Sequence, residues 1–381
     1  MLRPAQVAPG AASGEDREPV YTSPVPSRRK PSNGKPPVQP VSQRMLADYL
    51  GLSAATVSLV MNGSPVADAI PQETKDRIFA AARRFNYRPN FVARSLRTQR
   101  SFMIGVLVPE VSEGYAAMVI GGIEDHLLQE GYFYLVASHR HKADLIEEYP
   151  RLLWSRSVEG LIAVDTPWVH DMPVPAVAIS GRGQAKGITN IVLDHERAAE
   201  LAMDHLYRLG HRRIAYIQGQ AFSSDTEVRW NSIVKAARQR DLVIEPNLIV
   251  QLEGDLPSPE LGYGVTHKLL ASGEEFTALF AFNDISAIGA IRALRETGFR
   301  VPEDVSVVGF DDIQSAAFQN PGLTTVRQPL RRMGQLAAET VLRAITSPAS
   351  RRARLITVEP ELVVRESTCA AVGRSKLVRR R

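Results

Sequence analysis

The sequence predicts a small all-α unit, a short hinge helix and a large α/β core of two subdomains. Three observations lead to this fold class. Short helical patterns rich in Lys and Arg occupy residues 42–88. Apolar, strand-like runs alternate with amphipathic helical patterns from residue 102 to residue 312. The net charge of +5 is divided unevenly, with a basic front and an acidic body.

Composition indicates an ordinary globular protein. The 381 residues, 44% hydrophobic and 23% charged, have room for two or three compact units. No apolar run reaches the roughly 18 residues of a membrane helix, and the N-terminus lacks the apolar stretch of a signal peptide. The single cysteine, Cys369, excludes an intrachain disulfide and a Cys-based zinc site. We therefore expect a cytoplasmic protein with no membrane partner, metal or cofactor.

The charge distribution points to a polyanion as partner of the front end. Residues 41–100 hold nine Lys or Arg against four acids, and residues 1–40 hold six against three. Residues 101–369 sum to −8, and the last twelve residues carry five basic groups and no acid. Nucleic acid is the usual partner of such a basic segment. A merely solvated basic face is an equally good interpretation of the charge alone.

The two ends of the chain have no pattern of a folded domain. Residues 1–40 contain nine prolines and few large apolar residues, so we expect a disordered leader; a Pro-rich docking segment is the alternative. Residues 369–381 form a basic tail. That tail either adds non-specific DNA affinity or is simply a disordered end.

Residues 41–88 predict a three-helix headpiece. Ser42 and Ser53 are suited to cap the first two helices, which Gly51 separates. Val57 and Val60 should face inward from the second helix, and a third helix should follow at about 72–86. The apolar stripe expected on the first helix consists of Leu46, Tyr49 and Leu50.

The second helix has the pattern of a DNA-reading helix. The spacing S-x-x-T-V-S-x-x-x-N-G aligns short hydroxyls and an amide along one helix face, where they can bond phosphates beside the helix N-terminus. A helix-turn-helix lays such a second helix in the major groove. The alternative is that these side chains only cap the helix and bond back to it. The basic segment that follows favours DNA, and residues 89–100 predict a hinge helix and linker.

From residue 102 onward the β-α alternation predicts parallel sheets with helices on both faces. So many strands fit two subdomains better than one sheet, and ligands bind beyond the carboxyl ends of such strands. A cleft between the subdomains is therefore the expected ligand site. The expected strands are 102–111, 132–138, 158–164, 175–180, 190–194, 213–219, 248–254, 278–284 and 305–312, and the expected helices 116–131, 144–156, 195–209, 226–240, 258–272 and 284–297.

Several blocks, in order, resemble the lactose-repressor (LacI/GalR) family of bacterial transcription regulators over residues 42–367. The blocks are "LADYLGLSAATVSLVMNG", "FNYRPNFVARSLRTQRS", "IGVLVPEVS", "LDHERAAELAMDHLYRLGHRRIAYIQG", "ALFAFNDISAIGAIRALRETGFRVPEDVSVVGFDDI" and "LTTVRQPLRRMGQLAAE". The resemblance implies an operator-binding helix-turn-helix headpiece, a hinge helix in the minor groove, and a periplasmic-binding-protein-like core that binds a small effector and dimerises. It implies a core over 101–368, divided into an N-subdomain (about 101–193 and 330–357) and a C-subdomain (about 194–328 and 358–367).

The resemblance assigns DNA contacts residue by residue. Ala54, Ala55 and Leu59 match base-reading positions; the family often has Arg where this chain has Leu59. Apolar groups read only shape and thymine methyls, so we expect A·T-bearing half-sites. Leu96 matches a wedge between base pairs, the alternative being packing against Val92. The remaining contacts are Ser42, Ser53, Thr56, Ser58 and Asn62 on phosphates or as caps, Gln43 and Arg44 at the groove edge, Tyr87 and Asn90 as backbone anchors, and Ala93 in the hinge.

One segment departs from the family. The loop after Asn62, "GSPVADAIPQET", is about three residues longer than usual. Because loop closure entropy grows slowly with length, we expect the fold to tolerate it, while its phosphate contacts are in doubt.

The resemblance also places an effector pocket between the subdomains. Carboxylates such as Asp311 accept bonds from hydroxyls, Arg229 donates from a rigid fork, and Tyr115 and Phe310 offer an apolar face. A sugar-like polyol fits this set, with a nucleobase as the alternative. For each polar residue a structural cap is the competing interpretation; we expect Asp284 and Asp312 to be caps and His211 to be structural. The predicted effector contacts are Ser112, Glu113, Tyr115, Ser180, Asp225, Arg229, Asn283, Asp311 and Gln328.

These observations favour a ligand-responsive DNA-binding repressor that reads a pseudo-palindromic operator. A transporter's solute-binding protein would share the core but lack the headpiece. An enzyme is disfavoured because no P-loop, no GxGxxG after a strand and no GxSxG is present. After Thr368 no leucine heptad follows, which predicts a homodimer rather than a tetramer. The effector's identity, the direction of its effect and the operator sequence stay open.

Overall fold

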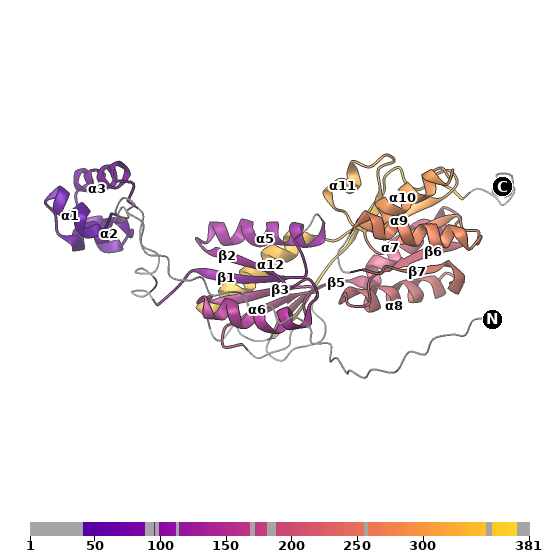
Figure 1. The fold of residues 1–381 in the computed structure, drawn as a ribbon, viewed down its shortest axis with the longest axis horizontal. Coiled ribbons are helices and arrows are strands. Elements are labelled where there is room, and N and C mark those ends of the chain that lie inside the picture. The colour runs from indigo at the N-terminus through magenta and orange to yellow at the C-terminus, as the bar shows by residue number, and fades with distance from the viewer. Residues whose placement is uncertain are drawn as a thin grey trace, which may run out of the picture. The chain divides into compact units, whose positions relative to one another are not determined.

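The computed structural model describes residues 41–87, 95, 99–111, 114–167, 172–180, 188–254, 258–347 and 353–371. The chain divides into two compact units, one up to Asn90 and one from Phe91 onward, and each is described by itself (Figure 1). The predicted leader, the end of the basic tail and most of the predicted hinge lie outside the described residues. Ser95, within the predicted hinge, is helical.

The first unit is a small bundle of short helices, as predicted. Ser42 and Ser53 both cap the helices that follow them, and Gly51 ends the first helix in the left-handed region at φ 65°. The loop that is longer than usual contains a 3-10 helix with a buried Ala67, so it is folded onto the headpiece core. The elements are α1 (Gln43–Leu50), α2 (Ala54–Met61), η1 (Pro65–Ala69) and α3 (Gln72–Arg84).

The headpiece core confirms the inward positions of α2 and corrects one position of α1. Val57 and Val60 are buried, as expected. Tyr49 was expected in the apolar stripe but is 52% exposed. The buried side of α1 runs through Leu46 and Ala47, which turns Tyr49 outward. Its ring instead packs edge-to-face on Phe85 of the same unit, with centroids 4.7 Å apart.

The second unit contains two sheets of six strands each. In the first sheet, every strand pairs in parallel, in the order β11-β5-β4-β3-β1-β2. Helix α6 covers one face and α5 and α12 the other (Figure 1). Its elements are β1 (Met103–Val108), α5 (Tyr115–Gln129), β2 (Phe133–Ser138), α6 (Ala143–Ser155), β3 (Gly160–Val164), β4 (Ala176–Ile179), β5 (Thr189–Leu193), α12 (Leu330–Thr346) and β11 (Leu355–Val358).

The second sheet has the order β12-β10-β9-β8-β6-β7 and is parallel except for β12, which runs antiparallel to β10. Helices α7 and α8 cover one face, and α9 and α10 cover the other. Its elements are α7 (His195–Arg208), β6 (Ile214–Gln218), α8 (Asp225–Arg238), η2 (Pro246–Leu248), β7 (Ile249–Gln251), α9 (Pro259–Ala271), β8 (Ala278–Ala281), α10 (Asp284–Glu296), β9 (Ser306–Asp311), α11 (Gln314–Ala317), β10 (Thr324–Arg327) and β12 (Glu361–Val363).

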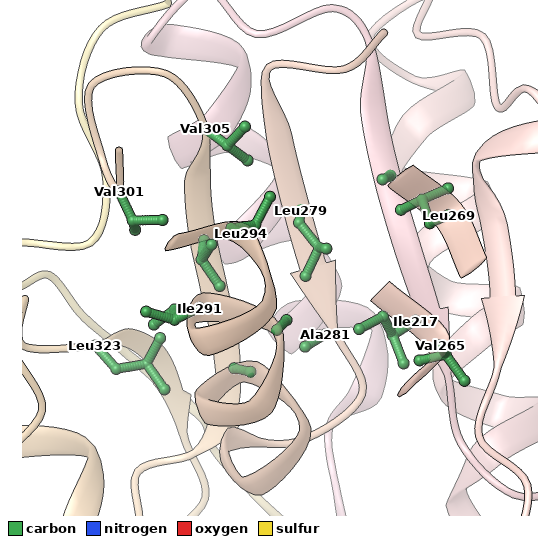
Figure 2. Close-up of a cluster of buried hydrophobic side chains, with 14 of the residues drawn as sticks. Ile217, Val265, Leu269, Leu279, Ala281, Ile291, Leu294, Val301, Val305 and Leu323 are labelled. Atoms are coloured by element: carbon green, nitrogen blue, oxygen red, sulfur yellow. The ribbon is translucent and has the colours of Figure 1, made fainter. Parts of the chain in front are cut away.

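Both faces of each sheet are packed, which explains the near-continuous apolar runs in the sequence. In β8, Leu279 and Ala281 face α9 and α10, whereas Ala278 and Phe280 face α7 and α8. Figure 2 shows the first of these clusters, with Ile291 of α10 among its buried side chains. The strand period of two therefore divides each strand between two separate cores.

The predicted fold class is confirmed: a helical headpiece precedes two doubly wound subdomains. The expected strands and helices lie within a few residues of those observed. Among the described residues beyond 312, five elements were not predicted one by one: α11, β10, α12, β11 and β12. Through them the chain returns to the first sheet and then to the second. Across the described part of the chain, no helix is both long and apolar enough to span a bilayer.

Candidate DNA-binding and effector-binding sites

The N-terminal end of α2 presents small side chains to solvent. Ser53, Ala54 and Ala55 are exposed, so a groove of DNA can approach this end of the helix closely. Leu59, the third predicted base-reading position, is only half-exposed, because it packs against the headpiece core. Two of the three positions are thus fully available for contact.

The predicted phosphate partners all make hydrogen bonds within the headpiece. Ser42 Oγ accepts from the Met45 amide at 3.2 Å. Ser53 Oγ accepts from the Thr56 amide at 3.0 Å and lies 2.8 Å from the Thr56 hydroxyl. Asn62 Nδ2 donates to Ser58 Oγ at 3.1 Å and to the Ser58 carbonyl. The capping role is therefore observed, while contact with phosphates stays a prediction.

Three of the remaining predicted DNA contacts belong to the headpiece that the structure describes: Gln43, Arg44 and Tyr87. Gln43 is half-exposed at the start of α1, and Tyr87 is half-buried against the headpiece core. Arg44 is exposed beside Gln43. Asn90, Ala93 and Leu96 lie outside the described residues.

Asp311 and Gln328 form the centre of the predicted effector site. Asp311 ends β9 with an unusual φ of 114°, and Gln328 follows β10. Gln328 Nε2 donates to Asp311 Oδ1 at 2.6 Å. Both side chains are at least 95% buried, and Gln328 Oε1 has no hydrogen-bond partner among the described residues. A buried acceptor without a donor costs about 1–3 kcal/mol, which a ligand donor or a water would recover.

Arg229 of α8 is held by the protein itself. Its guanidinium lies 3.7 Å from the centre of the Phe310 ring and 4.4 Å from that of Phe282. It donates to Asp225 Oδ2 at 3.4 Å and to the Phe282 carbonyl. Only Nε lacks a partner among the described residues. Phe310 is therefore covered by Arg229 rather than open to a ligand, contrary to expectation.

The other predicted residues join the same cluster. Tyr115, at the start of α5, donates to Ser180 Oγ at 2.9 Å. Asp225, at the start of α8, lies 3.4 Å from His195 Nε2. Ser112 and Glu113 lie outside the described residues. The cluster thus brings together the ends of strands and helices from both subdomains, as a cleft site requires.

Asp165 belongs to this cluster but was not predicted from the sequence. It directly follows β3, and its carboxylate accepts from the Ser224 amide at 3.0 Å, the Ser223 hydroxyl at 3.3 Å and the Ser224 hydroxyl. These bonds tie the first subdomain to the segment that begins α8 in the second. Asp311 was predicted from the family resemblance. Both residues are carboxylates at the carboxyl end of a buried strand, and that pattern is a signal in the sequence that could have identified Asp165.

Three carboxylates in this cluster are mutually repulsive. Burial raises the pKa of Asp311 to about 7, although Arg229 and Gln328 oppose the rise. Burial and the negative charge of Asp225 raise the pKa of Asp165 to about 6. Burial would raise the pKa of Asp225 too, but its contacts with His195 and Arg229 outweigh burial and lower it. Near neutral pH, Asp225 is thus the carboxylate that keeps its charge most firmly.

Two expected caps have other roles. Asn283, not Asp284, caps α10, because Asn283 Oδ1 accepts from the Ser286 amide at 2.9 Å. Asp284 is buried and accepts from the Ile313 amide at 2.9 Å and the Thr325 hydroxyl at 2.6 Å. Its side chain therefore bonds β10 and the residue that closely follows β9, rather than the first turn of α10.

Asp312 is likewise no cap. Its carboxylate pairs with Arg327 at 2.7 Å and Arg365 at 2.6 Å. His211 agrees with the structural role expected for it: one ring nitrogen lies 2.9 Å from the Thr277 hydroxyl, and the other 3.0 Å from the Cys369 carbonyl.

A pocket of about 940 Å³ adjoins the buried cluster. Ser180, Ser224 and Asp225 form the wall that it shares with the cluster, and His195 and Thr357 also line it. Arg229, Asp311 and Gln328 do not line it, and all three are buried. Arg229, Asp311 and Gln328 are therefore closed to solvent in this conformation, whereas Tyr115, Asp165 and Asn283 are half-buried. The pocket lies on the α7–α8 side of the cluster.

A headpiece with an exposed helix N-terminus, followed by a two-subdomain core with a polar cleft, defines a ligand-responsive DNA-binding regulator. Residues 46–90 match the family "Bacterial regulatory proteins, lacI family", and residues 203–368 match the "Periplasmic binding protein-like domain". A relative named HTH-type transcriptional repressor PurR, from Haemophilus influenzae, is 32% identical over 333 residues, which cover 84% of this chain and 97% of that protein. The chain belongs to the LacI family and is a ligand-responsive DNA-binding transcriptional repressor.

Solved structures agree with this assignment. The lac repressor dimer bound to operator and the anti-inducer ONPF is 29% identical, with a TM-score of 0.76, and the match covers 87% of this chain and 100% of that one. The transcriptional regulator CelR in complex with cellobiose is 27% identical, with a TM-score of 0.63, and the match covers 86% of this chain and 99% of that one.

Proposed function

We propose that this repressor binds a pseudo-palindromic operator as a homodimer, with α2 in the major groove. The exposed N-terminal end of α2 supports this proposal, since small side chains permit close approach to bases. Half-sites bearing A·T pairs suit Ala54 and Ala55. The proposed DNA contacts are Ser42, Gln43, Ser53, Ala54, Ala55, Thr56, Ser58, Leu59, Asn62, Tyr87, Asn90, Ala93 and Leu96. Operator selection from random duplexes tests this; strong guanine preference opposite Ala54 and Ala55 would refute that assignment.

The edge strand β2 supports the proposed dimer. Phe133 and Val136 on β2 are 61% and 39% exposed, and Leu128 on the adjoining α5 is 62% exposed. An open sheet edge with exposed apolar side chains is a surface that another chain readily covers. One relative, the lac repressor, has been solved as a dimer. Phe133→Lys should shift the mass in sedimentation equilibrium from two chains towards one, and an unchanged dimer would exclude this edge.

We propose a small, uncharged, donor-rich effector, with a sugar-like polyol as first choice. The observation that carries this is the charge balance of the cleft cluster. Asp165, Asp225 and Asp311 are carboxylates, whereas the one guanidinium that the described residues bring to them, Arg229, is already bonded by Asp225 and Phe282. Such a site offers acceptors to hydroxyl or N–H donors and repels phosphate or carboxylate groups. The cellobiose complex of CelR is a precedent in a relative.

A thermal-shift panel on the full chain tests the effector class, because a bound ligand stabilises by mass action. Neutral pentoses, hexoses and disaccharides should raise the melting temperature, and their phosphorylated forms should not. Nucleobases are the second arm, since their N–H groups suit the same carboxylates. Stabilisation by sugar phosphates alone would refute the proposal.

We further propose that the effector acts by population shift in the cytoplasm. A ligand that contacts both subdomains favours one of their relative poses by its differential affinity, and that pose changes operator affinity. The proposed effector contacts are Ser112, Glu113, Tyr115, Ser180, Asp225, Arg229, Asn283, Asp311 and Gln328, to which we add Asp165. Operator binding measured with and without the stabilising sugar gives the direction of the response.

A further inference from the structure

The segment that leads into β1 is bound by a single carboxylate at both its side chain and its backbone. Glu159 Oε2 accepts from Arg100 Nη2 at 2.8 Å and from Arg100 Nε at 3.2 Å. Glu159 Oε1 accepts from the Phe102 amide at 2.8 Å. Two donors from one guanidinium give a directional, charge-assisted contact. The positive charge of Arg100, counted above with the basic front end, is thus paired with a carboxylate of the core, although the Arg100 side chain is still 36% exposed.

Two aromatic rings complete this contact. The Arg100 guanidinium lies 4.8 Å from the centre of the Phe102 ring and 5.9 Å from that of Tyr132. The two rings meet edge-to-face with centroids 5.5 Å apart, and Arg100 also donates to the Tyr132 hydroxyl. Cation-π and edge-to-face contacts both restrict orientation. We call Arg100, Phe102, Tyr132 and Glu159 the Arg100 clamp.

The backbone of the clamped segment follows a strained path. Gln99 and Phe102 both have φ of 52°, in the left-handed region that residues with a Cβ avoid. Such conformations persist only where surrounding contacts enforce them. The contacts are present: the Phe133 amide donates to the Phe102 carbonyl at 2.8 Å, and the Glu159 amide to the Met103 carbonyl at 2.8 Å. The backbone of segment 99–103 is therefore held in one defined conformation.

The clamp and the cleft lie at opposite ends of one strand. Glu159 directly precedes β3, every residue of which is buried, and Asp165 directly follows it. Asp165 carries the hydrogen bonds to Ser223 and Ser224 of the other subdomain. A densely packed strand moves as one piece rather than deforming. The five residues of β3 are thus the direct covalent link between Asp165 in the cleft and Glu159 in the clamp.

We propose that the Arg100 clamp sets the position and direction in which the DNA-binding hinge leaves the core, and links them through β3 to the effector cleft. Arg100 is then a positioning residue for operator binding rather than a phosphate contact. This inference rests on the proposed function, because it requires that the chain bind an operator. It extends that function by naming the side chains through which the core controls the headpiece.

Glu159→Gln in the full chain separates this proposal from simple electrostatics. The change keeps the shape of Glu159 and removes its negative charge. If Arg100 is a phosphate contact, freeing it from Glu159 leaves operator affinity unchanged or raises it. If the clamp positions the hinge, operator affinity falls, by about tenfold or more, since a hydrogen bond between charged groups is lost. The probe is the duplex that the wild-type protein selects from a random pool.

Matched variants keep the test decisive. Glu296→Gln removes a carboxylate from the exposed pair with Arg292 on α10 and should leave operator affinity unchanged. Arg100→Gln should weaken binding as Glu159→Gln does, and the double variant should be no worse than either single one. Arg100→Lys keeps the positive charge but loses the paired Nε and Nη2 donors, so it should also weaken operator binding. This variant tests the clamp if Glu159→Gln does not fold.

The results of these experiments separate the proposed operator binding from the proposed role of the Arg100 clamp. If the wild type selects no duplex, the proposed function and the clamp both fail. If the wild type binds its duplex and Glu159→Gln binds equally well or better, the clamp alone is refuted. Additive losses in the double variant would also refute it, since Arg100 would then act independently of Glu159.

Discussion

Replacing Asp311 by asparagine should stabilise the protein and weaken its effector binding. Asp311 is 5% exposed, and its pKa is about 7, against 3.8 for an ordinary aspartate. One unit of pKa difference is worth about 1.36 kcal/mol, so the ionised form of Asp311 destabilises the folded state by about 4 kcal/mol. Asparagine has nearly the same shape, carries no charge and tolerates a positive φ better than most residues. The variant thus resembles protonated Asp311 at every pH.

The pH dependence follows from the direction of the shift. An acid whose pKa is raised by folding holds its proton in the folded state while the unfolded state releases it. Wild-type stability is therefore lost progressively as the pH rises from 3.8 to about 7, and no more is lost above that. The advantage of Asp311→Asn should be about 4 kcal/mol at pH 8 and about 1.5 kcal/mol at pH 5.

Differential scanning calorimetry of the full chain measures this effect. At about 2 °C for each kcal/mol, the core transition of Asp311→Asn should be about 8 °C higher than that of wild type at pH 8, and about 3 °C higher at pH 5. Asp241→Asn, at an exposed turn position, is the control and should change neither value. A variant less stable than wild type at pH 8, or an advantage that does not shrink at pH 5, would refute the reasoning. Stabilisation by the sugar should also be lost in Asp311→Asn.

Four further substitutions test the fold. Ser53→Ala should destabilise the headpiece by about 1 kcal/mol through loss of the α2 cap, measured by thermal circular dichroism. Gly289→Ala places a Cβ 1.9 Å from a backbone oxygen of α9 and should cost about 2 kcal/mol or more, whereas Gly264→Ala on α9 meets open space and should raise the melting temperature slightly. Arg365→Gln should destabilise the core by about 2 kcal/mol, because it removes one of the two arginine partners of the half-buried Asp312; an unchanged melting temperature would show that Arg327 alone suffices.

Local patterns account for the parts of the fold that were predicted. The caps at Ser42 and Ser53 depend on atoms three residues apart, and the apolar period of each strand depends on its two packed faces. Tyr49 was misplaced because three neighbouring apolar positions do not reveal which side of a short helix meets its partners. Asn283 and Asp284 were interchanged because either is an acceptable cap by residue type.

The effector site was predicted by residue but not by arrangement. Asp311 and Gln328 were both expected, yet nothing in the sequence shows that their side chains bond each other or that Gln328 Oε1 is left without a donor. Arg229 was expected to serve the ligand and is instead enclosed by Phe282 and Phe310. Its engagement depends on the exact approach of α8 to two strands, which is a property of packing.

The sequence alone determined that this chain is a DNA-binding headpiece joined to a two-subdomain core, because both follow from short-range patterns and ordered blocks. Only the tertiary structure decided which charges meet. Arg100 and Glu159 are separated by 58 intervening residues, and Asp165 and Ser224 belong to different subdomains. Electrostatic contacts depend on distance in space, and the folding of parallel strands brings distant parts of a chain to the same sheet edge. That is why the Arg100 clamp and the hydrogen bonds from Ser223 and Ser224 to Asp165 appear only in the folded molecule.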